Sequence, residues 1–108
     1  MNISSPAFEH SSHMPKVHSY TGGNVSPPLT FSNIPTEAKS LALICHDPDA
    51  PRAQGNTHWV VWNIPPNTKR INAGELPQDS TVGMSDFNTT VWGGPAPPSG
   101  THRYNFYV

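Results

Sequence analysis

Charged residues are scarce in this chain of 108 residues: it has six lysines and arginines, seven aspartates and glutamates, and a net charge of −1. The basic residues are scattered, so nothing in the charge pattern indicates a nucleic-acid partner or an anionic membrane surface. The single cysteine, Cys45, excludes an internal disulfide and a zinc site built from cysteines. It lies in an apolar segment, and we interpret it as a small buried core residue.

Long apolar runs are also missing. No segment is long enough to predict a signal peptide or an integral membrane helix. By default, we therefore predict a cytoplasmic protein. The length predicts a single domain that spans residues 1–108.

Proline and glycine, by contrast, are abundant, with thirteen and eight residues. Such a composition is typical either of a disordered chain or of short strands joined by many turns. The apolar residues decide between the two, because they gather in runs such as residues 41–45 and 59–62. Disordered chains lack such clusters. We therefore expect a folded domain with much loop.

The clearest predicted strands are residues 40–47 and 58–64, whose apolar centres predict that both faces of each strand are covered. Residues 36–39 favour a single helical turn, because Thr36 can cap it. Shorter strands are expected within residues 29–35, near 82–84 and over 103–108. The pattern predicts a mainly β fold, with two packed antiparallel sheets.

Two stretches around the predicted strands carry polar side chains suited to a site. Asp47 and Asp49 are held two residues apart by prolines where the first clear strand ends, and such strand ends often form pockets. The same residues would equally make an ordinary β-turn with solvated carboxylates. His58 opens the next strand, and alternation places it on the face of Val60 and Trp62, at the rim of a core face.

A third stretch, residues 100–104, reads Gly-Thr-His-Arg-Tyr after a proline-rich loop. His102 and Tyr104 are two residues apart on a strand, so they share a face and form a donor set suited to an oxyanion. Arg103 points the other way, where it would either pair with Asp47 or Asp49 or remain solvated. Each signal is weak alone.

Together, the order and spacing of these motifs resemble those of the phosphatidylethanolamine-binding protein family, in its bacterial and archaeal, Raf kinase inhibitor-like branch. The motifs that carry the resemblance are the DPDAP turn, the HWVVWNIP strand, the GGPAPP loop and the GTHRY strand. The resemblance covers residues 4–108. Family members continue beyond the last motif, whereas this sequence ends inside a strand pattern, so we expect the C-terminal part of the domain to be missing.

The resemblance implies a β-domain of two antiparallel sheets with Greek-key links and a small pocket for phosphate, acetate, cacodylate or phosphoethanolamine. It implies a binding and regulatory domain without cofactor and without enzymatic activity. Its ligand would be a small anion, and a kinase or protease is the implied class of protein partner. The implied pocket residues are Asp47, Asp49, His58, Ala96, Pro97, His102 and Tyr104.

The chemistry of these side chains suits an anion, which needs hydrogen-bond donors and positive potential. His58 and His102 supply both when protonated, and Tyr104 supplies a hydroxyl donor. Asp47 would repel a phosphate, so its expected role is to orient a histidine and raise the pKa of that histidine.

Three alternatives remain open at this point. Two histidines and a carboxylate could form a metal triad, although the resemblance argues against it. A hydrolase could use a histidine as base and Ser99 as nucleophile, but Ser99 lacks a nucleophile-elbow pattern. The domain could also be an interaction protein that binds no anion.

Overall fold

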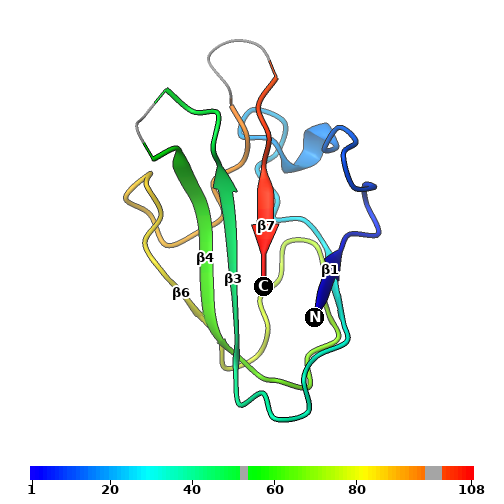
Figure 1. Ribbon diagram of the computed structural model, residues 1–108. Helices are drawn as coiled ribbons and strands as arrows, with labels where there is room; N and C mark the ends of the chain where they lie inside the picture. The colour runs from blue at the N-terminus through cyan, green and yellow to red at the C-terminus, as the bar shows by residue number, and fades with distance from the viewer. Residues whose placement is uncertain (52–53, 97–100) are drawn as a thin grey trace.

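The computed structural model describes residues 1–51, 54–96 and 101–108 of the chain (Figure 1). These residues form two antiparallel sheets, ordered β1-β2-β5 and β6-β4-β3-β7. The predicted fold class, mainly β with two antiparallel sheets, is confirmed. The elements are β1 (Asn2–Ser4), the 3-10 turn η1 (Lys16–His18), β2 (Leu29–Ser32), β3 (Leu41–Asp47), β4 (Asn56–Ile64), β5 (Arg70–Ile71), β6 (Thr81–Val82) and β7 (Asn105–Tyr107).

The antiparallel pair of β3 and β4 lies at the centre of the larger sheet and confirms the two clearest predicted strands (Figure 1). The prediction that both faces of these strands are covered is wrong. Ile44 on β3 is 40% exposed and Trp62 on β4 is 42% exposed, whereas Leu43 and Val61 are fully buried. Neighbouring side chains of a strand point to opposite faces, and an apolar run does not reveal which face packs on the core.

Residues of both sheets form the hydrophobic core. The chain crosses between the sheets after β2, β4 and β5. Cys45 is fully buried within this core, as predicted, and burial raises the pKa of its thiol. The buried apolar residues are Leu29, Phe31, Leu41, Leu43, Cys45, Trp59, Val61, Ile64, Ile71 and Trp92.

The shorter elements depart from the predicted bounds. β2 ends at Ser32, β6 ends at Val82 and β7 is limited to Asn105–Tyr107. Residues 36–39 form no helix: the chain makes only a turn, in which the Ala38 N–H donates to the Pro35 carbonyl at 3.1 Å. β1 and β5 were not predicted, because strands of two or three residues are too short to show a period and owe their pairing to β2.

No helix in the described part of the chain is long and apolar enough to cross a membrane.

Candidate functional site

His58 lies at an irregularity in the pairing of β3 and β4. Cys45 pairs with Trp59 and His46 pairs with Thr57, so His58 is an extra residue without a direct partner. Such a β-bulge breaks the period of two and re-aims a side chain. His58 is therefore 3% exposed, while Trp62 is 42% exposed. The prediction that these two residues share a face is wrong for this reason.

The His58 ring is held on three sides. Its Nδ1 hydrogen-bonds the carbonyl of Gly93. The rings of Phe87 and Tyr104 make T-shaped contacts with it, with ring centroids 4.9 and 5.2 Å from that of His58. Burial lowers the pKa of His58 below 6.5, and this effect outweighs the opposing ones of the Gly93 bond and of Asp47. Burial therefore favours the neutral form of the ring. It thus disfavours the protonated form, in which we expected His58 to supply positive charge.

Gly93, which sequence reasoning missed, is fixed by the N-terminal part of the chain. The indole N–H of Trp92 donates to the His18 carbonyl at 3.0 Å, and the Gly94 N–H donates to Asn24 Oδ1 at 2.6 Å. A Cβ at Gly93 would lie 2.5 Å from the Phe87 ring, so a larger residue does not fit there. The consecutive glycines are the sequence signal that could have indicated this close backbone approach.

Asp47 is 3% exposed and uses both carboxylate oxygens within the protein. Oδ1 accepts the Asp49 N–H and Oδ2 accepts the Nδ1–H of His102, each at 2.8 Å. The expected contact between Asp47 and a histidine is confirmed, and the histidine is His102. This bond fixes the ring of His102 with its Nε2 directed away from the carboxylate.

Asp49 holds the segment that precedes β7. Its carboxylate accepts the backbone N–H of Arg103 at 2.6 Å and two guanidinium nitrogens of Arg103 at 2.8 to 3.2 Å. These hydrogen bonds lower the pKa of Asp49 to about 2. One of the two predicted partners for Arg103 is thus confirmed. With Arg103 turned outward, the residues on either side of it face the protein.

Tyr104 lies between the two histidines. Its ring centroid is 5.2 Å from that of His58 and 6.4 Å from that of His102, which it overlies at 24°. Burial, together with the negative charge of Asp47, raises the pKa of Tyr104 to about 12. The hydroxyl therefore keeps its proton and can donate a hydrogen bond.

We call Asp47, His58, His102 and Tyr104 the polar cluster. In the described part of the chain, no hydrogen bond uses Nε2 of His58, Nε2 of His102 or the hydroxyl of Tyr104. These three atoms are the groups of the cluster that remain available to a ligand.

Two further predicted site residues and one candidate nucleophile lie nearby in sequence. Ala96 is exposed at the end of a described segment, while Pro97 and Ser99 lie outside the described residues. Among the described residues, no group of three or more histidine, cysteine or acidic side chains is arranged to hold a metal ion.

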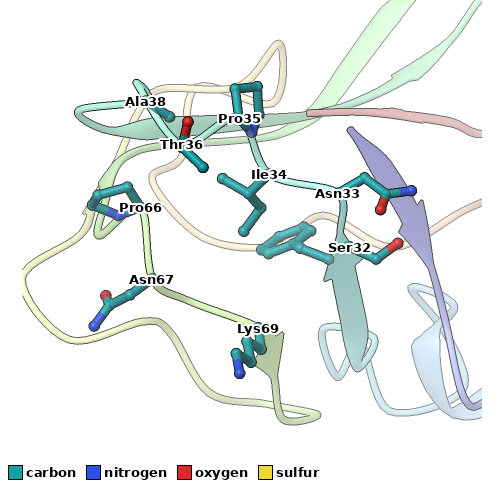
Figure 2. Close-up of a pocket in the computed structure, with 10 residues that line it drawn as sticks. Ser32, Asn33, Ile34, Pro35, Thr36, Ala38, Pro66, Asn67 and Lys69 are labelled. Carbon is teal, nitrogen blue, oxygen red and sulfur yellow. The ribbon is translucent and has the colours of Figure 1, made fainter.

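A cavity of about 580 Å³ lies elsewhere, between the β2–β3 and β4–β5 connections (Figure 2). None of the predicted site residues lines it. Its walls are Phe31, Ser32, Asn33, Ile34, Pro35, Thr36, Ala38, Pro66, Asn67 and Lys69.

A family model described as phosphatidylethanolamine-binding protein matches residues 4–108, which include the whole polar cluster. The chain belongs to the phosphatidylethanolamine-binding protein family. Membership agrees with the sheet arrangement and with the motifs that the sequence shows.

The similarity extends to archaeal and bacterial members of the family. The chain is 47% identical to a UPF0098 protein of Methanothermobacter thermautotrophicus, over 98% of this chain and 73% of the relative. It superposes with a TM-score of 0.91 on the crystal structure of a phosphatidylethanolamine-binding protein homologue from Chlamydia trachomatis, at 38% identity over 96% of this chain and 70% of that one. For Escherichia coli YbcL, the TM-score is 0.90, at 34% identity over 96% and 72% of the two chains.

Proposed function

We propose that the polar cluster binds the phosphate group of a small anionic ligand, and that the domain acts by binding and not by turnover. The observation that carries the proposal is the 2.8 Å bond between His102 Nδ1 and Asp47 Oδ2. An imidazole held by a carboxylate at one nitrogen can take a proton at the other and then donate to an oxyanion as a charged group.

The carboxylate of Asp47 does not oppose this role. Both of its oxygens accept hydrogen bonds from the protein, from His102 and from the Asp49 backbone, so neither is presented to a ligand. The Tyr104 hydroxyl adds a second donor beside His102. The name of the Chlamydia trachomatis homologue, a phosphatidylethanolamine-binding protein, supports phosphoethanolamine as the first ligand to test.

An NMR titration with O-phosphorylethanolamine tests the proposal. We expect saturable shifts centred on His58, His102 and Tyr104. His102→Ala should weaken binding by about tenfold or more, because it removes one hydrogen bond to a charged group. His10→Ala is the matched control, since His10 is exposed and belongs to no part of the cluster. If phosphorylethanolamine causes no saturable shift in the wild-type chain, anion binding is wrong.

A hydrolase is the second candidate, because the same Asp47–His102 bond would also orient a general base. The titration sample, incubated with p-nitrophenyl phosphate, separates the two functions. Turnover that is lost in His102→Ala would favour the hydrolase, whereas binding without turnover supports the proposed function. The cytoplasmic location and a kinase or protease partner stay predictions.

A further inference from the structure

The two ring nitrogens of His58 have different hydrogen-bonding roles. Nδ1 hydrogen-bonds the carbonyl of Gly93, and a carbonyl oxygen can only accept. Nδ1 therefore carries the proton of the ring. In the neutral imidazole, the other nitrogen, Nε2, then holds a lone pair and can only accept a hydrogen bond.

This tautomer is imposed by the surroundings of the ring. Gly93 is held in place by the bonds that Trp92 and Gly94 make to the N-terminal segment, and the rings of Phe87 and Tyr104 pack against the His58 ring in T-shaped contacts. Rotation of the ring would break the Gly93 bond in a buried position, at 3% exposure. Burial also favours the neutral form.

The open atoms of the polar cluster thus differ in kind. Tyr104 offers a proton, and so does His102 once it is protonated, but His58 Nε2 offers a lone pair. A ligand oxygen without a proton would place its own lone pairs against that nitrogen. Leaving a largely buried acceptor without a donor lowers the affinity of the complex. His58 Nε2 therefore favours a ligand that donates a proton to it.

Inorganic hydrogenphosphate carries both kinds of group, because it exposes accepting oxygens and one P–OH donor. A phosphate monoester carries the P–OH only below its second pKa of about 6. Sulfate has nearly the same shape but carries no proton near neutral pH. We propose that the polar cluster selects oxyanions that bear an O–H, with His58 Nε2 as the acceptor of that proton. This selection rests on the proposed function and narrows its class of ligand.

The test compares inorganic phosphate with sulfate at about pH 7, where each anionic form of phosphate carries at least one P–OH and sulfate carries none. Calorimetry with the full chain should show sulfate binding at least about tenfold more weakly than phosphate. Equal affinities, or tighter binding of sulfate, would overturn the selection while leaving anion binding intact. Binding of neither anion would overturn the proposed function and the selection with it.

A second measurement needs no variant and so does not depend on whether a substituted chain folds. The imidazole ¹⁵N shifts of His58 should show a protonated Nδ1 and an unprotonated Nε2 in the free protein. Phosphate should move the Nε2 resonance, and sulfate should not. His46, whose Nδ1 lies 3.3 Å from Thr57 Oγ1, provides an internal reference in the same spectrum. A protonated Nε2 in the free protein would contradict the inference.

Discussion

The two ends of the β3–β4 pair differ in how their polar atoms are used. At the end where β3 finishes and β4 begins, the polar cluster holds buried side chains whose hydrogen bonds reach residues far away in sequence. At the other end, the cavity lies beside the connections that lead into β3 and away from β4 (Figures 1 and 2). No acidic residue or histidine is among the described residues that line the cavity.

The difference shows that a hollow and a binding site are separate properties. Ligand sites combine enclosure with a few convergent polar groups. In the polar cluster, Asp47 uses both of its oxygens within the protein, while His58, His102 and Tyr104 each keep one polar atom that no described residue bonds. The polar residues around the cavity, such as Asn33, Thr36 and Asn67, are exposed. We therefore expect substitutions at the polar cluster to lower the free energy of unfolding by more than matched substitutions at the cavity.

The largest difference should come from truncation of one polar side chain at each end. Asp47→Ala removes the acceptor of two hydrogen bonds in a buried position, so we expect it to lower the free energy of unfolding by about 2–3 kcal/mol. Asn67→Ala changes an exposed side chain at the cavity and should stay within about 0.5 kcal/mol of the wild type. Urea unfolding measures both, and equal losses would erase the distinction between the two ends.

Adding a methyl or more at each end should give a smaller difference. Gly93→Ala places a Cβ 2.5 Å from the Phe87 ring and forces a shift beside His58. Such overpacking should cost about 1–2 kcal/mol. Ala38→Val, which extends a side chain that lines the cavity, should change stability by less than about 0.5 kcal/mol. Thermal or urea unfolding of the two variants measures this, and a larger cost for Ala38→Val would reverse the comparison.

The smallest expected difference is in how the free energy of unfolding depends on pH. Burial holds the pKa of His58 below 6.5 in the folded chain, so the unfolded chain takes up this proton first as the pH falls. The contribution of neutral His58 to stability is therefore present above pH 6.5 and is lost below it. Urea unfolding between about pH 7.5 and 5.5 should show a steeper loss for the wild type than for His58→Gln. His10→Gln should keep the wild-type slope, and identical slopes in all three proteins would contradict the assignment.

The strand pattern of the sequence was sufficient to predict the central pair of the larger sheet. Residues 40–47 and 58–64 correspond to β3 and β4, because apolar runs of this length favour strands and the bounding prolines end them. The shared face of His102 and Tyr104, the outward turn of Arg103 and the burial of Cys45 also followed from local rules. Such features depend on a few neighbouring residues, so they can be predicted from the sequence.

Tertiary structure decided what the sequence could not. His58 is the extra residue of a β-bulge in the β3–β4 pairing, and the bulge directs its side chain toward the interior of the protein. The carbonyl of Gly93 then set the tautomer of the His58 ring. The choice of His102 as the partner of Asp47 joins residues 55 positions apart. Local propensity cannot fix these contacts, because they depend on register and on backbone positions set by distant segments. The sequence thus determined which chemical groups the protein has, and the packing of the chain decided which of their atoms remain free.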